Sequence, residues 1–195
     1  MNRKPNALAV ANYFIEIAKR EGKGITQLGL MKRVYIAHGF SLAIHHKSLL
    51  DPRFDKVEAW KYGPVIPNVY HSFKQYRSNP ILEKTVIMTW DDSRSEPVYE
   101  FPELDDEDAK AVVEMVWRRY HRMSDSDMVA LTHQKGTPWD VCYIEGMNKP
   151  IPDEVTELYY KKNSGLCRRA IQETCWAASP PMMAFARSLP VLTVL

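Results

Sequence analysis

The sequence predicts a mostly α-helical (α+β) fold, a compact helical domain built around a central apolar helix and carrying a small β-hairpin. Three observations lead to this prediction. Apolar residues recur at helical spacing in most segments of the first 163 residues. The segment 26–45 is apolar on nearly every face, as expected of a helix that is packed on several sides. Strand-like runs joined by a polar loop stand out only at 85–101.

The first two helices have clear boundaries in the sequence. Helical spacing of apolar residues predicts a first helix over 5–21, which Gly22 ends. Thr26 is expected to cap the central helix, which runs to about His45. Gly39 within that helix costs about 1 kcal/mol relative to Ala. A close approach by another backbone would explain why a glycine is tolerated there.

The stretch EAWKYGPVIPNVYHSFKQY, residues 58–76, is dense in aromatic residues and proline. A short extended segment is expected at 57–60. Pro64 moves Gly63 out of the helical region, so Tyr62-Gly63-Pro64 should form a stiff corner. Trp60 and Tyr62 are expected to pack beneath it, and Pro67 to start a short helix.

The later elements follow from capping residues and periodicity. They are expected in this order: a hairpin of strands 85–90 and 97–101; a helix after Asp105–Asp108 whose buried face is Val112, Val113, Val116, Trp117 and Tyr120; a short helix from the capping pair Ser124 and Asp127 to Thr132; another from Pro138-Trp139; and a last helix over 152–162 that buries Val155, Leu158 and Tyr159.

Two regions are expected along the chain. Residues 1–163 form the main domain, and 164–195 form a C-terminal extension that is partly helical, over 166–178, or loose. The extension ends in SPPMMAFARSLPVLTVL, which is apolar and broken by prolines. If 180–195 are loose, removing them should leave folding unchanged.

The composition is typical of a globular protein of the cytoplasm. Hydrophobic residues make up 45% and charged residues 26% of the 195 residues, and no window has the length and apolarity of a bilayer span. A signal peptide is not expected, since charged residues interrupt the first 24 positions. The three cysteines, Cys142, Cys167 and Cys175, fit a reducing compartment and match no metal or redox spacing. The oligomeric state stays open.

The net charge of +2 conceals two halves of opposite sign. Residues 1–84 hold 14 Lys/Arg and 6 Asp/Glu, a balance of +8, whereas 85–163 hold 9 and 17, a balance of −8. Such a division would steer a charged partner or let two halves of one fold attract each other. We favour the second interpretation, because both sets of charges lie on predicted amphipathic helices.

The sequence offers no convincing catalytic or cofactor site, so we predict a protein that is not an enzyme. No phosphate-binding loop or nucleophile elbow occurs, and the six histidines lack metal-ligand spacing. No cofactor or metal is therefore expected. A hydrolase or metal site around His133, Asp140 and Cys142 remains an alternative, although the cysteine has no evident base.

Nucleic acid is not expected as a partner. The first two helices loosely suggest a helix-turn-helix, but a recognition helix needs a polar face toward the groove. The segment 26–45 has little polar surface to expose, chiefly Gln27, Lys32 and Arg33 with the following His46. A DNA-binding regulator therefore stays a lesser alternative.

Three blocks in order and at characteristic spacing resemble the Panacea domain, a family that includes SocA-like antitoxins and phage-associated proteins of the GepA type. They are ITQLGLMKRVYIAHGFSLAI, EAWKYGPVIPNVYHSF and LTHQKGTPW. The closing IPDEVTELYYKK resembles the family's last helix, and the resemblance covers about 6–162, leaving the extension unmatched.

The resemblance implies a bacterial or phage protein that acts by binding. It implies the antitoxin of a toxin–antitoxin pair, which neutralises a partner toxin by direct contact and in some members delivers it to a protease. A phage- or prophage-encoded accessory protein that binds a host or defence factor is the alternative. The residues expected to form or support the partner surface are Trp60, Tyr62, Gly63, Pro64, Val65, His133, Pro138 and Trp139.

Overall fold

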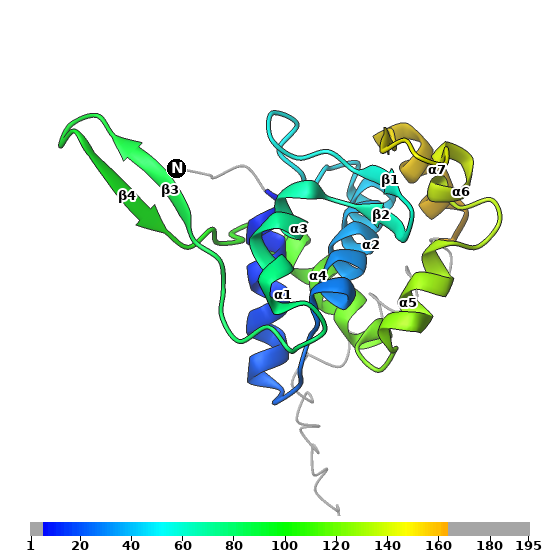
Figure 1. The fold of residues 1–195 in the computed structure, drawn as a ribbon, viewed down its shortest axis with the longest axis horizontal. Coiled ribbons are helices and arrows are strands. Elements are labelled where there is room, and N and C mark those ends of the chain that lie inside the picture. Colours follow the sequence, from blue (N-terminus) through cyan, green and yellow to red (C-terminus); the bar gives the residue numbers. More distant parts are fainter. Residues whose placement is uncertain (1–5, 164–195) are drawn as a thin grey trace, which may run out of the picture.

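The computed structural model describes residues 6–163, which form helices around a central one and two small antiparallel sheets (Figure 1). The elements are α1 (Ala7–Arg20), α2 (Gln27–His45), β1 (Glu58–Trp60), β2 (Gly63–Val65), α3 (Pro67–Phe73), the 3₁₀ helix η1 (Lys74–Tyr76), β3 (Ile87–Asp91), β4 (Glu96–Glu100), α4 (Glu107–Tyr120), α5 (Asp125–Thr132), α6 (Pro138–Cys142), β5 (Lys149–Pro150) and α7 (Asp153–Asn163). The mostly α-helical prediction is confirmed. The predicted C-terminal extension, with its helix at 166–178, lies outside the described residues.

Helix α2 is the centre of the core, as its apolar sequence predicts. Sixteen of its 19 residues are buried. It packs against α1, α3, α4, α5, α7 and β2. The side chain of Thr26 caps the helix by accepting a hydrogen bond from the Gly29 amide at 3.1 Å, and its hydroxyl donates to Asp125 at 2.7 Å. One residue thus starts α2 and ties it to α5.

Gly39 allows a close approach, but by a side chain and not by a backbone as expected. A Cβ at Gly39 would overlap the ring of Tyr160 on α7. That ring lies edge-on to Phe40, with centroids 4.8 Å apart, and to Tyr35 at 6.1 Å. The glycine therefore makes room for the aromatic contact that holds α7 on α2.

The outer helices begin where their acidic and capping residues predict, and one predicted face is wrong. Asp106 caps α4 by accepting from the Ala109 amide, and Ser124 and Asp127 form the predicted capping box of α5. The predicted buried face of α4 is confirmed except for Tyr120, which is only partly buried. On α7, Leu158 is 62% exposed, and Thr156 and Tyr160 are the buried residues. The two faces of this helix differ too little in apolarity to reveal the buried one.

Lys47, just after α2, links the two charged halves of the chain through a contact of the kind that the intramolecular interpretation predicts. Lys47 pairs with Asp106 at 3.5 Å and with Asp108 at 3.1 Å, both at the start of α4. Fully buried His38 contacts Asp153 at the start of α7, with Nε2 and Oδ1 3.0 Å apart. This hydrogen bond lowers the pKa of Asp153. The acidic starts of α4 and α7 thus contact Lys47 and His38, respectively.

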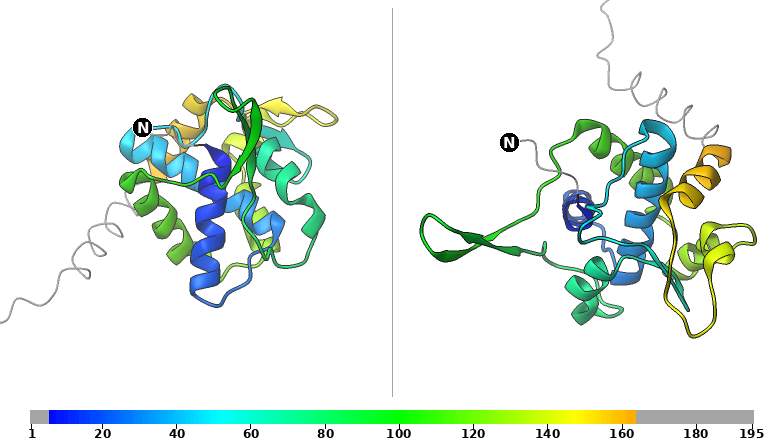
Figure 2. Two further views of the ribbon diagram at one scale, coloured as in Figure 1. Left: turned by 90° about the vertical axis from the view of Figure 1, so that its left-hand side faces the viewer. Right: turned by 90° about the horizontal axis from the view of Figure 1, so that it is seen from above.

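The structure contains two small sheets where the sequence indicates one. The predicted hairpin is present as β3 and β4, paired from Ile87↔Glu100 to Asp91↔Glu96. It projects from the helical body as an arm (Figure 1; Figure 2, right). The second sheet has the order β2-β1-β5 and lies against α2. Its strand β1 corresponds to the extended segment expected at 57–60, but its pairing with β2 and β5 was not expected. Strands of two or three residues are too short to show alternation.

Candidate functional site

Residues 58–65, the first part of the aromatic stretch, form a tight hairpin, and its corner lies one residue earlier than expected. Trp60 pairs with Gly63 in the β1–β2 register, so Lys61 and Tyr62 are the two turn residues. Gly63 has φ +99°, a conformation that other residues rarely adopt. The stiff corner predicted from Gly63 and Pro64 is therefore a two-residue β-turn closed by the glycine.

A buried lysine holds the inner side of this turn. The Nζ atom of Lys32, from the middle of α2, donates to the carbonyl oxygens of Tyr62 at 2.5 Å and Pro64 at 3.2 Å. Lys32 is fully buried, and burial lowers its pKa to about 7. Gly63 leaves the space for this ammonium group, because a Cβ there would overlap Nζ. The lysine and the glycine therefore specify the turn together.

Residues from the LTHQKGTPW block hold the outer side of the turn. The indole Nε1 of Trp139 donates to the carbonyl of Trp60 at 2.7 Å. His133 has Nδ1 2.7 Å from the Val129 carbonyl and Nε2 3.5 Å from the Lys61 carbonyl. The rings of His133 and Trp139 are in contact, with centroids 3.9 Å apart. Two sequence blocks thus meet at one turn, through residues that are 72 and 79 positions apart in the chain.

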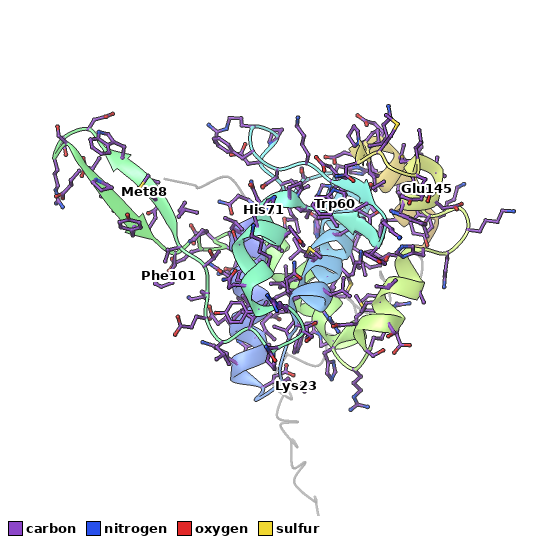
Figure 3. All side chains as sticks on the ribbon, viewed as in Figure 1. Lys23, Trp60, His71, Met88, Phe101 and Glu145 are labelled. Atoms are coloured by element: carbon purple, nitrogen blue, oxygen red, sulfur yellow. The ribbon has the colours of Figure 1, made fainter. Side chains whose placement is uncertain are left out.

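The predicted site residues divide into a supporting set and an exposed set. Gly63, Pro64, Val65 and Pro138 are buried, and His133 and Trp139 are partly buried. Trp60 is half-buried against Tyr70, with ring centroids 5.1 Å apart, and its position in the body is labelled in Figure 3. Tyr62 is 67% exposed, which corrects the expectation that it packs beneath the corner. The turn therefore presents Tyr62 to solvent on a fixed backbone.

Comparison with known proteins places this chain in one family. The family described as "Antitoxin SocA-like, Panacea domain" matches residues 30–140, which contain every predicted site residue. This chain belongs to that family. A curated relative, "Antitoxin SocA" of Caulobacter vibrioides (strain NA1000 / CB15N), is 35% identical over 140 residues, which cover 70% of this chain and 69% of the relative. No solved structure matches the chain.

Lys32 is the main residue around the β1–β2 turn that the sequence does not indicate. It lies in the first block of the family resemblance, where the sequence suggested an exposed polar residue. In the structure Gln27, Lys32 and Arg33 are all buried. A lysine inside an otherwise apolar helix is the signal that would have pointed to it, since lysine is seldom buried without a partner.

The burial of α2 also bears on the DNA-binding alternative. A recognition helix must lie in the major groove with its side chains free to contact base edges. In this Panacea domain α2 is enclosed by other helices, and Arg33 donates to the carbonyls of Tyr120 at 2.7 Å and Met123 at 3.1 Å. The second helix is therefore a core element and cannot enter a groove without unfolding the domain.

The groups of the alternative hydrolase site are used in local structure. Asp140 is exposed and accepts from the Gly136 amide at 2.9 Å, and His133 contacts two backbone carbonyls. Burial raises the pKa of the Cys142 thiol, whereas a nucleophilic cysteine needs a lowered one. Within residues 6–163 no three His, Cys, Asp or Glu side chains are grouped as a metal site would require. No helix of this described part is long and apolar enough to cross a bilayer.

Proposed function

We propose that this chain is an antitoxin, a protein-binding module that neutralises a partner toxin by direct contact. The observation that carries the proposal is the family membership together with a relative named "Antitoxin SocA", which aligns over about 70% of both chains. In this proposal the protein acts by occupying a surface of the toxin and performs no reaction. Delivery of the bound toxin to a protease is a second way in which such a complex would remove toxin activity.

The fixed β1–β2 turn supports the proposal as a partner-binding element. Tyr62 and Lys61 are exposed at its tip, while Lys32, Trp139 and His133 hold its backbone. An exposed tyrosine on a preorganised backbone loses little conformational freedom on binding, and tyrosine is enriched among residues that dominate binding energy. We therefore assign Tyr62 to direct contact with the toxin, and the buried residues around it to its support.

Co-expression with the small protein encoded beside this gene tests the proposal. The neighbour alone should stop growth, and this chain should restore it and co-purify with the neighbour at 1:1 or a higher fixed ratio. Tyr62→Ala should weaken the complex roughly 30-fold, the effect of one dominant interface residue. Phe54→Ala is the matched control, since Phe54 is 69% exposed on another loop.

Two outcomes would contradict the proposal. A neighbour that remains fully active beside well-folded chain would refute neutralisation. A gene without a toxic neighbour, whose product instead captures a host defence protein, would support the phage-accessory alternative. The half-life of the toxin in the co-expressing cells separates direct neutralisation, which leaves the toxin level unchanged, from protease delivery, which lowers it.

A further inference from the structure

The β3–β4 arm carries an apolar face that is largely exposed. At its base, Nζ of Lys84 lies 5.3 Å from the centroid of the Phe101 ring. The register sets Met88 opposite Tyr99 and Trp90 opposite Pro97. Directly opposed residues and residues two apart share one face of a sheet, so these four lie together. Val86 and Phe101 continue the same alternation at the base of the arm. We name this set, Val86, Met88, Trp90, Pro97, Tyr99 and Phe101, the ribbon face.

The ribbon face is exposed along its whole length. Met88, Trp90 and Tyr99 are 61–66% exposed, and Val86 and Phe101 are nearly half exposed. Figure 3 labels Met88 on the projecting arm and Phe101 near its base. The three aromatic side chains alone expose roughly 350 Å², given about 200 Å² for each ring side chain. That is within the range of the largest apolar patch on a typical monomer, which is often functional.

A hairpin that only completes its own domain packs its more apolar face on the core, and the arm does not. Its other face carries Thr89, Asp91, Glu96 and Glu100 beside Ile87 and Val98. A two-stranded ribbon is marginally stable in water unless an apolar face packs on something. Here the more apolar face points into solvent. The structure thus holds out an apolar surface that a second molecule would cover.

The net charge of the arm indicates which class of molecule would bind the ribbon face. Residues 86–101 carry a net charge of −3, with Asp91, Asp92, Glu96 and Glu100 against Arg94, which pairs with Asp91 and Glu96. Asp91, Glu96 and Glu100 lie on the opposite face of the arm, but the arm is one sheet thick, so their charge acts on a molecule at the ribbon face within a Debye length, ~10 Å. Packing the ribbon face on the ribbon face of a second copy would bring two such charges together, and like charges disfavour a complex. A protein surface that is apolar at its centre and flanked by Lys and Arg would be complementary in both respects.

We propose that the ribbon face docks onto a partner protein that presents an apolar surface flanked by basic residues. Resting on the proposed function, this partner is the toxin. The arm then supplies apolar area, and the β1–β2 turn supplies a second, fixed contact. The exposed area of the ribbon face is well below the roughly 800 Å² that each side of a standard interface buries. The arm is therefore one part of the interface and not all of it.

Site-specific photo-crosslinking of the full chain in its native host tests the docking without assuming the partner. Benzoylphenylalanine replaces Met88 on the ribbon face, and replaces exposed Phe54 in the control. We expect an adduct from position 88 that maps to an apolar segment flanked by Lys or Arg. The adduct should fall at least tenfold when Trp90→Thr and Tyr99→Thr are added. Threonine keeps the strand propensity, so the arm should persist in circular dichroism.

Other adducts would overturn the proposal. An adduct between two copies of this chain would do so, as would an adduct that maps to an acidic or wholly polar segment. The proposal would also fail if position 88 gave no more adduct than the control position 54. The matched control variant, Phe54→Thr with Val98→Thr, removes two apolar side chains that lie outside the ribbon face. It should leave the yield of the adduct unchanged. Equal loss in both double variants would indicate unfolding of the arm and refute a role for this face.

The identity of the captured protein separates this proposal from the proposed function. A toxin supports both. A protein that meets the mapping and variant criteria but is no toxin supports the ribbon face and contradicts the antitoxin function. With a toxin in hand, Trp90→Thr/Tyr99→Thr should weaken its complex roughly 100-fold, the effect of two dominant aromatic contacts. Full neutralisation and unchanged affinity in that variant would overturn the ribbon face and leave the antitoxin function standing.

Discussion

Replacing Gly63 with alanine should strongly lower the free energy of unfolding of the domain. The substitution introduces two separate costs. Alanine must adopt φ +99°, which side chains with a Cβ rarely take. The new Cβ would also overlap Nζ of Lys32 and lie 2.7 Å from Cε1 of His133. The ammonium group is the end of a flexible chain, but it is fully buried and cannot move without leaving its carbonyl partners.

The two costs have different sizes. Left-handed backbone at a non-glycine residue costs about 1–2 kcal/mol. Weakening the hydrogen bonds from Lys32 to the carbonyls of Tyr62 and Pro64 costs about 1.5–3 kcal/mol more, the value for bonds to a charged group. We therefore expect Gly63→Ala to lower the free energy of unfolding by about 2.5–5 kcal/mol. That is a large part of the 5–15 kcal/mol typical of a domain.

Urea denaturation followed by tryptophan fluorescence measures this loss, and Gly136→Ala separates its two parts. Gly136 also has positive φ, +81°, but a Cβ there would contact nothing within 4 Å. It should show the backbone cost alone, about 1–2 kcal/mol. If both variants lost the same free energy within about 0.5 kcal/mol, the packing of Lys32 against Gly63 would not contribute, and the reasoning would be refuted.

Three further predictions concern the same core. Gly39→Ala should lower the free energy of unfolding by a net ~1–2 kcal/mol, because overpacking against Tyr160 exceeds the gain in helix propensity. Adding Tyr160→Leu in a double-mutant cycle should recover part of this loss, and additive losses would contradict the prediction. Trp139→Phe keeps the ring but removes the donor to the Trp60 carbonyl, so urea denaturation should show a loss of about 1–2 kcal/mol, and an unchanged midpoint would be the contrary result. Burial lowers the pKa of Lys32 to about 7, so between pH 7 and about 10.4 the unfolded chain binds more protons and stability should rise with pH, by at most ~1.4 kcal/mol per unit. Lys32→Met should lack this part of the slope, and an identical pH profile in the variant would disprove it.

The helices were predictable because their signals are local. The caps at Thr26, Asp106 and Ser124 each satisfy amide groups within three residues, so a short window of sequence contains the whole interaction. The uniform apolarity of 26–45 likewise predicts a buried helix from composition alone. The β3–β4 hairpin was predictable for the same reason, since its strands are five residues long and joined by a polar turn.

The details that were missed depend on contacts between distant segments. The role of Lys32 depends on carbonyl groups 30 and 32 residues away, which no periodicity reports. The partner of Gly39 is a ring 121 positions later in the chain. Tyr62 was expected to be buried because large aromatic residues usually are, but a two-residue turn leaves its second side chain in solvent.

The buried Lys32 fixes the conformation of the β1–β2 turn. An apolar side chain at position 32 would avoid the cost of taking an ammonium group out of water, but it would leave the carbonyls of Tyr62 and Pro64 without a donor. Buried charge of this kind specifies a conformation more than it adds stability. The turn is therefore held in one conformation before any partner arrives. The ribbon face of the arm, in contrast, is mostly exposed and is contacted at its base, where Lys84 lies over Phe101. We expect a partner to find Tyr62 preformed and to fix the arm on binding. Affinity should then depend on Lys32 through the turn and on Trp90 through the arm, and the two effects should be nearly additive.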